Sequence, residues 1–202
     1  PSGNTSGRPS PTNAADMLED MEGKIDGILD GGPCSVGVES TIVDLTETPP
    51  RLLRPGGITL EQLESVLGRV EVDQAVTRLM SAGEKPRAPG MKYRHYAPKA
   101  PVTVVAGPPE RTAEHIARSL TPGDGVICFD EFAGEFPGCQ IQRMGPAGDK
   151  SAQARHIFDA LRAFDHTEVP RIWAQCPDPS GLGLAINNRL NKAAGFHIVE
   201  VK

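Results

Sequence analysis

Apolar residues in the second half of the chain alternate between strand and helix spacing. Short runs rich in valine and isoleucine are separated by stretches such as 154–164, where apolar residues recur every three or four positions. This pattern predicts strands at 102–105, 125–129, 140–142, 171–175 and 197–201, and helices at 110–120, 151–165 (capped by Ser151) and 182–194. Alternating strands and helices favour a mostly parallel sheet in a three-layer α/β unit.

The first part of the chain predicts shorter elements. Ser10 followed by Pro11 is typical of a helix start, with serine as N-cap, and this helix would end near Glu22. Strands are predicted at 25–30, 38–45 and 51–54, with a further edge strand at Val70 and Val72. A helix is predicted at 59–67, with a Thr59–Gln62 capping box and Gly68 after its end. Residues 73–100 have little periodicity and several prolines, which is typical of a linker.

Composition sets limits on the class of protein. The 202 residues allow one large domain or two small ones, and 38% hydrophobic and 23% charged residues are ordinary for a globular protein. No apolar run approaches the roughly 18 residues of a membrane span. The four cysteines are scattered without a C-x-x-C pair, which predicts neither a zinc site nor a disulfide framework. We therefore expect a cytoplasmic protein with reduced thiols and no bound protein metal.

The net charge of -5 argues against a protein whose whole surface binds nucleic acid. Residues 85–99 nevertheless hold five lysine and arginine residues, no acid, and both tyrosines of the chain, Tyr93 and Tyr96. One interpretation gives this segment a function at a binding site. The other makes its tyrosines an anchor that pins the linker to one domain, and the sequence leaves both open.

The stretch 31–60 carries the candidate chemistry. It places the Ser40 hydroxyl in a predicted strand, Arg54 at a strand end, and Gly56-Gly57 beside a helix start. Ser2, Asn4 and Ser10 add hydrogen-bonding groups ahead of another helix, and such donors beside a helix N-terminus bind phosphate. The planar guanidinium of Arg54 would add charge and paired donors. For Ser10 alone a simple cap is favoured, so this pattern by itself predicts only phosphate or nucleotide binding.

Other motifs predict less. The run GLGLA at 181–185 lacks the third glycine and the distal acid of a dinucleotide fingerprint, which favours a tight turn. The sequence contains no Walker P-loop and no Ser-His-Asp set. An anionic nucleophile that attacks a phosphate would need no general base, only positioning and charge neutralisation.

Five segments, in order, carry a resemblance to a known family: PSGNTSGRPSPT, GKIDGILDGGPCSVGVESTIVDLT, LLRPGGIT, APGMKYRHYAPKAP and GLGLAINNRLNKAAG. The chain resembles the Sua5 branch of the Sua5/YciO/YrdC family over essentially its whole length. The resemblance implies a threonylcarbamoyl-AMP synthase, a nucleotidyltransferase that combines L-threonine, bicarbonate and ATP, with Mg²⁺ accompanying the ATP, and releases pyrophosphate. Its product, L-threonylcarbamoyladenylate, would pass to a threonylcarbamoyl-transfer complex for the t6A modification of tRNA.

The resemblance also implies roles for individual residues. Ser40 would hold threonine, and Arg54 would be the catalytic residue that offsets charge at the reacting phosphate. The residues that would contact ATP are Ser2, Asn4, Ser10, Arg54, Tyr93, His95 and Tyr96. The last three would fold across the pocket from the linker.

The resemblance implies a division of the chain. Residues 1–72 would be the C-terminal part of a twisted, YrdC-like α/β catalytic domain, 73–101 a pocket-covering linker, and 102–202 a Rossmann-like Sua5 domain. Because the family's K-x-R motif would precede Pro1, we expect this chain to be a fragment. Whether the fragment is active by itself is left open. Two alternatives remain: a double-stranded RNA or tRNA binder that uses the 85–99 run without catalysis, and a 102–202 domain that serves only as a lid or docking surface.

Overall fold

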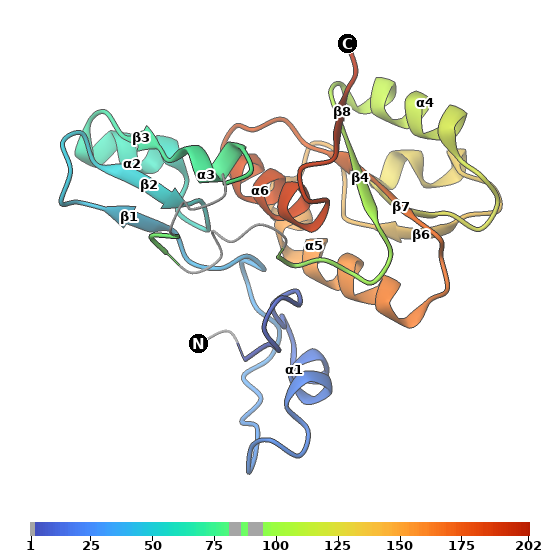
Figure 1. The fold of residues 1–202 in the computed structure, drawn as a ribbon, viewed down its shortest axis with the longest axis horizontal. Coiled ribbons are helices and arrows are strands. Elements are labelled where there is room, and N and C mark those ends of the chain that lie inside the picture. Colours follow the sequence, from blue (N-terminus) through green and yellow to red (C-terminus); the bar gives the residue numbers. More distant parts are fainter. Residues whose placement is uncertain (1–2, 81–85, 89–94) are drawn as a thin grey trace.

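The computed structural model describes residues 3–80, 86–88 and 95–202. It contains two sheets that lie next to each other, with the N-terminal segment below them (Figure 1). The chain therefore contains three parts: an N-terminal arm (residues 3–21), a small sheet and a large sheet.

The large sheet is parallel throughout, with strand order β6-β5-β7-β4-β8. This confirms the predicted parallel-sheet α/β architecture. The strands are β4 (Val102–Ala106), β5 (Gly125–Cys128), β6 (Gln140–Arg143), β7 (Ile172–Cys176) and β8 (Ile198–Glu200). Its helices are α4 (Pro109–Ser119), α5 (Lys150–Ala163) and α6 (Gly183–Ala193), with 3-10 turns at Asp130–Glu135 and Phe164–His166.

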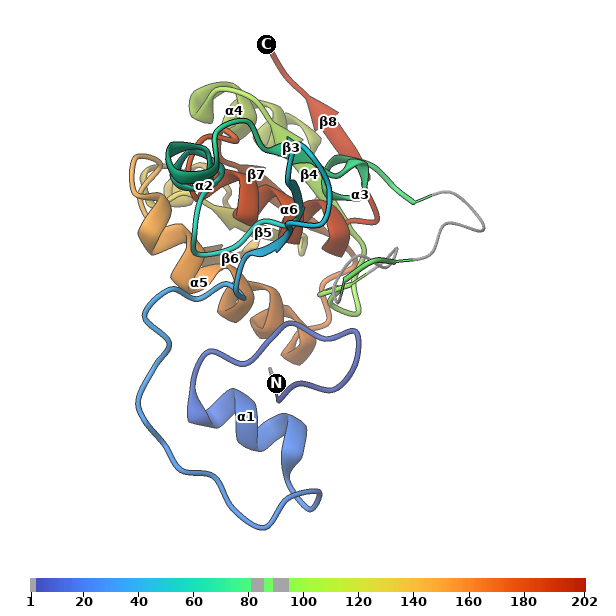
Figure 2. The same cartoon turned by 90° about the vertical axis from the view of Figure 1, so that its left-hand side faces the viewer.

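Each face of the large sheet has its own core, because successive strand side chains point to opposite faces. Val104 belongs to the cluster that also holds Phe158 of α5 and Leu190 of α6. The next residue, Val105, belongs to the cluster with Ile116 of α4. Helices therefore cover both faces of the sheet, and α5 and α6 share the face that turns toward the rest of the chain (Figures 1 and 2).

The small sheet pairs β1 (Ile42–Asp44) antiparallel to β2 (Arg51–Arg54), and β2 parallel to β3 (Glu71–Val72). Helix α2 (Leu60–Leu67) has the predicted capping box and ends at Gly68, whose φ of +75° suits glycine. A short helix, α3 (Gln74–Thr77), follows β3 and buries Ala75 and Val76. The start of the predicted linker is therefore structured rather than extended.

Three predictions about local structure are wrong. Helix α1 (Ala14–Met21) is capped by Asn13, whose side chain accepts a hydrogen bond from the Asp16 amide, and Ser10 lies outside it. The predicted strand at 25–30 is absent: among the described residues no strand pairs with this segment, and its apolar Ile25, Ile28 and Leu29 are exposed. Likewise Asp149, rather than Ser151, caps α5.

The strand predicted at 38–45 is shorter than expected. Only Ile42–Asp44 pairs with β2, and the register shifts between Ile42 and Val43. Ser40 therefore lies just before the strand instead of within it. This difference matters because residues outside the ladder keep their polar groups available for other contacts.

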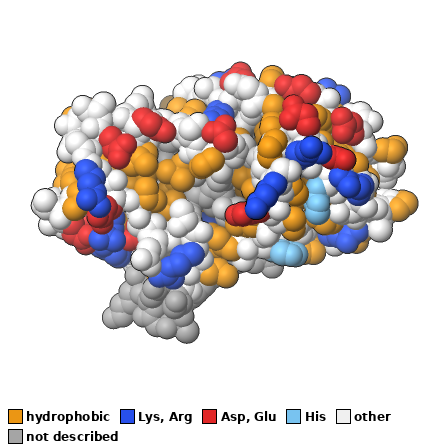
Figure 3. Space-filling view, turned by 90° about the horizontal axis from the view of Figure 1, so that it is seen from above, with side chains coloured by type: hydrophobic (Ala, Val, Ile, Leu, Met, Phe, Trp, Pro, Cys, Tyr) orange, Lys and Arg blue, Asp and Glu red, His pale blue; other side chains and the backbone are white. Residues whose placement is uncertain are grey.

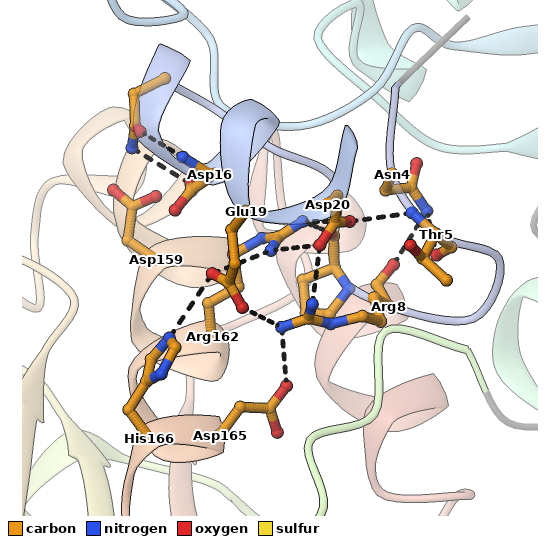
Figure 4. A network of polar contacts seen from close by, with 12 residues as sticks. Asn4, Thr5, Arg8, Asp16, Glu19, Asp20, Asp159, Arg162, Asp165 and His166 are labelled. Atoms are coloured by element: carbon orange, nitrogen blue, oxygen red, sulfur yellow. Dashed lines mark hydrogen bonds and ion pairs between the residues drawn. The ribbon is translucent and has the colours of Figure 1, made fainter. Parts of the chain in front are cut away.

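A buried ionic network fastens the N-terminal arm to α5 (Figure 4). Arg162 on α5 donates to Asp20 Oδ2 at 2.9 Å and to the Pro9 carbonyl at 2.6 Å. Asp20 also accepts from Arg8 at 2.7 Å and from the Thr5 amide at 2.8 Å. Hydrogen bonds from Arg162, Thr5 and Arg8 keep the pKa of Asp20 low although burial alone would raise it. The arm is thus held on the large-sheet domain by charge-assisted contacts.

A second buried carboxylate gives a pH prediction for the large-sheet domain. Burial alone would raise the pKa of Asp124, but hydrogen bonds from Thr121, Arg171 and Trp173 lower it. A lowered folded-state pKa stabilises the fold above the ordinary aspartate value of 3.8, and this contribution is lost as the pH falls below it. We expect Asp124→Asn to lower the free energy of unfolding by about 2 kcal/mol at neutral pH, and by less in acid. Urea unfolding of both proteins from pH 7 to pH 3 checks this, and a constant difference would contradict it.

Candidate functional site

The carboxylate of Glu39 lies at the centre of the candidate site. Ser10 Oγ donates to Glu39 Oε1 at 2.8 Å. Arg189 of α6 donates to Glu39 Oε2 through Nε at 2.9 Å and Nη2 at 2.7 Å. Burial alone would raise the pKa of Glu39, but the charge of Arg189 and the Ser10 hydrogen bond lower it. Glu39 is therefore an anion that joins the N-terminal loop to the large-sheet domain.

Arg54 binds the residue that follows Glu39. Its Nε and Nη2 donate to the Ser40 carbonyl at 3.1 and 2.9 Å, and Nη2 lies 3.3 Å from the Ser40 hydroxyl. The guanidinium is placed there because Arg54 ends strand β2, which runs antiparallel to β1 just after Ser40. Burial and the nearby Arg189 lower the pKa of Arg54, though it stays a cation. The two predicted site residues Ser40 and Arg54 are thus in direct contact.

Tyr96 joins the segment before β4 to the N-terminal arm and to helices α5 and α6. It is 1% exposed, its amide donates to the Gly7 carbonyl at 2.8 Å, and its ring lies 5.1 Å from that of Phe158. The Arg189 guanidinium lies 5.7 Å from the Tyr96 ring centroid. Its φ of +63° is unusual for a residue with a large side chain, and such strain persists only where the surroundings fix it. Tyr96 is therefore an anchor in the core and also a neighbour of Glu39.

Burial perturbs the other titratable groups here. It raises the pKa of Tyr96 to about 12 and lowers that of His95, helped in the second case by Lys192 and Arg189. Burial, with Arg189 and Arg54, also lowers the pKa of Lys192 to about 8. These interactions mean that the cations Arg54, Arg189 and Lys192 lie close enough to repel one another. Such a cluster around one carboxylate suits an anionic ligand.

A cleft of about 450 Å³ opens beside this group. Ser10 and Glu39 form part of its wall, together with Phe158 of α5 and the 34–38 segment. Arg54 and Ser40 do not line this cleft, but Ser40 follows Glu39 in the chain and Arg54 binds Ser40. The site therefore offers a pocket at Ser10 and Glu39, and the Arg54 guanidinium at Ser40, the residue after Glu39.

The structure brings together Ser10, Ser40, Arg54, His95 and Tyr96. Asn4 instead lies in the 4–8 turn, where its amide donates to the carbonyls of Thr5 and Arg8. Ser2 and Tyr93 lie outside the described residues. The sequence interpretation missed Glu39, Arg189 and Lys192. A signal for the last two existed, because helix 183–193 carries two cations and no acid.

Two findings bear on the alternatives. In the part of the 85–99 run that the structure describes, Arg87 pairs with Asp44 and Glu47, and the Lys99 ammonium donates to the Asp165 carbonyl. On the face drawn in Figure 3, basic and acidic side chains are interspersed rather than gathered by sign. These contacts do not favour a continuous basic surface for RNA.

In the described ranges, residues 3–80, 86–88 and 95–202, no group of three His, Cys, Asp or Glu residues could hold a metal ion. No helix among them is both long and apolar enough to cross a bilayer.

Gly56 gives a test of how tightly the site is packed. A Cβ at this position would lie 2.2 Å from the Glu39 carbonyl oxygen and 2.5 Å from the Thr41 amide nitrogen, both backbone atoms that cannot rotate away. We expect Gly56→Ala to push Ser40 from Arg54 and to cost about 1–3 kcal/mol of unfolding free energy. Gly57→Ala is the matched control, since its Cβ would meet only side-chain atoms of Val36, the nearest at 3.0 Å. Equal unfolding midpoints for the two variants would contradict this account.

The fold and site define an α/β protein with a parallel sheet. Helix α6 of the large-sheet domain brings Arg189 and Lys192 to a site that contains serine hydroxyls and Arg54. A sequence model described as "Threonylcarbamoyl-AMP synthase, C-terminal domain" matches residues 58–195. The Sua5_yciO_yrdC family model, described as "Telomere recombination", matches residues 1–56. The chain belongs to the Sua5 family of threonylcarbamoyl-AMP synthases, which confirms the family resemblance.

Individual relatives agree with this assignment. The chain is 44% identical to threonylcarbamoyl-AMP synthases of Bacillus subtilis, over 98% of this chain and 57% of the relative, and of Pyrococcus abyssi, over 100% and 58%. It thus spans a little more than half the length of these relatives. Among solved structures, Pyrococcus abyssi Sua5 complexed with L-threonine is 41% identical, with a TM-score of 0.83 over 100% of this chain and 59% of that one.

Proposed function

We propose that this chain is part of an enzyme that makes L-threonylcarbamoyladenylate from L-threonine, bicarbonate and ATP, with release of pyrophosphate. The observation that carries the proposal is the convergence of Ser10 and Arg54 on two consecutive residues, Glu39 and Ser40. The named activity of the relatives supports the same reaction.

The proposed roles follow from this arrangement. Ser10 and Arg54 bind ATP, Ser40 binds threonine, and the threonine complex of the Pyrococcus relative supports the second substrate. Asn4 belongs to the ATP side through the loop that it stabilises, and Ser2 with it. Tyr96 and His95 close the linker end of the site, together with Tyr93. Mg²⁺ enters with ATP as part of that substrate.

The proposed reaction has two bond-forming steps. The amine of threonine attacks bicarbonate and water leaves, which gives an N-carboxylate. An oxygen of that carboxylate then attacks the α-phosphorus of ATP, and the bond to pyrophosphate breaks. Because the nucleophile is already an anion, Arg54 assists by offsetting charge on the phosphate rather than by removing a proton. The Glu39 carboxylate is held by Ser10 and Arg189, so it is not left to repel the substrates.

The wider assignment is also a proposal. Residues 1–72 are the C-terminal part of a YrdC-like catalytic domain, 73–101 a pocket-covering linker and 102–202 a Rossmann-like Sua5 domain. The enzyme acts in the cytoplasm in t6A biosynthesis, and its product goes to a threonylcarbamoyl-transfer complex that acts on tRNA.

The experiment that tests the proposal measures pyrophosphate release by the complete gene product. We expect release to require ATP, threonine and bicarbonate together. Release that ignores threonine would overturn the assignment. Salt-sensitive binding of double-stranded RNA without any threonine-dependent turnover would favour the RNA-binding alternative instead.

A further inference from the structure

Arg189 lies on α6 of the large-sheet domain but reaches the residues of the proposed active site. We propose that Arg189 is a positioning residue, which lets this domain set the geometry of Ser10, Ser40 and Arg54; the inference rests on the function proposed above. The domain would then be part of the catalytic machinery, beyond a lid or a docking surface.

The Arg189 guanidinium fixes both sides of the Ser40–Arg54 contact. Two of its nitrogens donate to Glu39, the residue before Ser40. Its Nη1 donates to the carbonyl of Pro55, the residue after Arg54, at 2.7 Å. One planar group therefore holds the side chain of the residue before Ser40 and the backbone carbonyl of the residue after Arg54. Moving it would shift Ser40 and Arg54 relative to each other.

Glu39 extends this control to Ser10. One carboxylate oxygen accepts from the Ser10 hydroxyl and the other accepts both Arg189 hydrogen bonds. If the guanidinium were absent, the half-buried carboxylate would lose its cation and would turn toward water or toward Arg54. Ser10 would then lose its fixed acceptor at the wall of the cleft.

Helix α6 is a firm support for this group. Arg189 is 0% exposed, and its neighbours Ile186 and Leu190 are also completely buried in the core beneath the sheet. Asn188 accepts from Arg189 Nη1 at 3.1 Å and donates to the Val76 carbonyl at 2.9 Å, which ties α6 to α3. Because these contacts hold the side chain in one orientation, the guanidinium can transmit the position of the domain to the site.

Lysine could supply the charge of Arg189 but not its geometry. A guanidinium presents donors in a fixed plane, whereas an ammonium is a point charge on a flexible stem. Arg189→Lys therefore separates charge balance from positioning. If Arg189 only balances charge, Arg189→Lys should keep its activity. If Arg189 is a positioning residue, Arg189→Lys should lose activity, since one ammonium cannot hold both Glu39 and Pro55.

The test measures kcat and KM for ATP and threonine, with the melting temperature, in the complete gene product. Misplacing reacting groups by about 1 Å lowers rates about 100-fold, so we expect Arg189→Lys to reduce kcat/KM by about that factor and to raise both KM values. A loss of folded protein would lower apparent kcat but leave KM unchanged. Arg171→Lys is the matched control, because Arg171 binds Asp124 within the same domain and has no contact with Glu39 or Pro55. We expect it to reduce the melting temperature without changing either KM.

A second variant covers the case in which Arg189→Lys fails to fold. Asn188→Ala keeps the Arg189 charge but removes one acceptor that orients it, and we expect about a fivefold drop in kcat/KM with raised KM, as for one lost hydrogen bond. The inference is overturned if the folded variants keep wild-type kcat/KM and KM. If the wild-type protein shows no threonine-dependent pyrophosphate release, the proposed function fails, and that result is distinct from the first.

Discussion

Replacement of Arg54 by alanine in the complete gene product is expected to abolish ATP- and threonine-dependent release of pyrophosphate. The guanidinium touches the Ser40 carbonyl and hydroxyl, one residue from the carboxylate that holds Ser10. Loss of a positioned donor at a developing charge costs about 100- to 1,000-fold, and loss of an arginine at a transferring phosphoryl group can cost more. A continuous pyrophosphate assay under saturating substrates would measure a kcat at least about 100-fold below wild type.

Arg51 provides the control for Arg54. It lies at the other end of the same strand and pairs with Glu47 at 2.7 Å, with a side chain that is 30% exposed. Pairs at such partly exposed positions contribute about 1 kcal/mol or less, so Arg51→Ala is expected to fold and to turn over normally. Arg54→Lys tests geometry, since it keeps a charge but loses the fork of donors. Normal turnover by Arg54→Ala would remove Arg54 from the active site.

The large-sheet domain was predictable because its helices are long and the spacing of apolar residues in its strands and helices is clear. Every predicted strand between 102 and 201 exists, with ends that differ by no more than one residue. The N-terminal part was less predictable. The 25–30 stretch has strand-like residues but no neighbouring strand, and the small sheet depends on pairings between short segments. Local propensity cannot supply a partner strand, so the prediction at 25–30 failed, whereas the strand predicted at 51–54 is confirmed.

The sequence could name some residues of the candidate site but not the contacts between them. Ser10 was identified as a helix cap or nucleotide ligand, yet its hydroxyl binds Glu39 while Asn13 caps the helix. The contact between Glu39 and Arg189 joins residues 150 positions apart, and no local pattern encodes such a pairing. The family resemblance supplied Ser40 and Arg54 as a pair of roles, and the structure places them in contact.

The second large effect is expected at the buried network between the N-terminal arm and α5. Arg162 is 2% exposed and binds Asp20, whose side chain is completely buried. Removing one partner of a buried ion pair leaves an uncompensated charge and costs about 3–5 kcal/mol. Asp20 keeps its hydrogen bonds from Arg8 and the Thr5 amide in this variant. We therefore expect the cost of Arg162→Met to lie at the lower end of this range, a loss of about 3 kcal/mol in the free energy of unfolding. Denaturant unfolding followed by circular dichroism measures this.

Two comparisons separate this effect from ordinary loss of helix stability. Arg155 is an exposed residue of the same helix, so Arg155→Met should change the free energy of unfolding by about 0.5 kcal/mol or less. The double variant Arg162→Met with Asp20→Leu removes both charges of the pair, and we expect it to be more stable than Arg162→Met alone. A double variant that is less stable than Arg162→Met would contradict the ionic account.

The same substitution should also act on the proposed site, because Arg162 Nη2 donates to the carbonyl of Pro9, the residue before Ser10. With that bond lost, the arm should detach from α5, and residues 3–21 should become cleavable in limited proteolysis before the large-sheet domain is cut. Ser10 would then lose its position against Glu39, so the KM for ATP should rise even at temperatures where the protein remains folded. Added ATP should slow the cleavage if Ser10 contacts the nucleotide. Cleavage unaffected by ATP, together with an unchanged KM, would place the arm outside the catalytic site and leave the network a purely structural fastening.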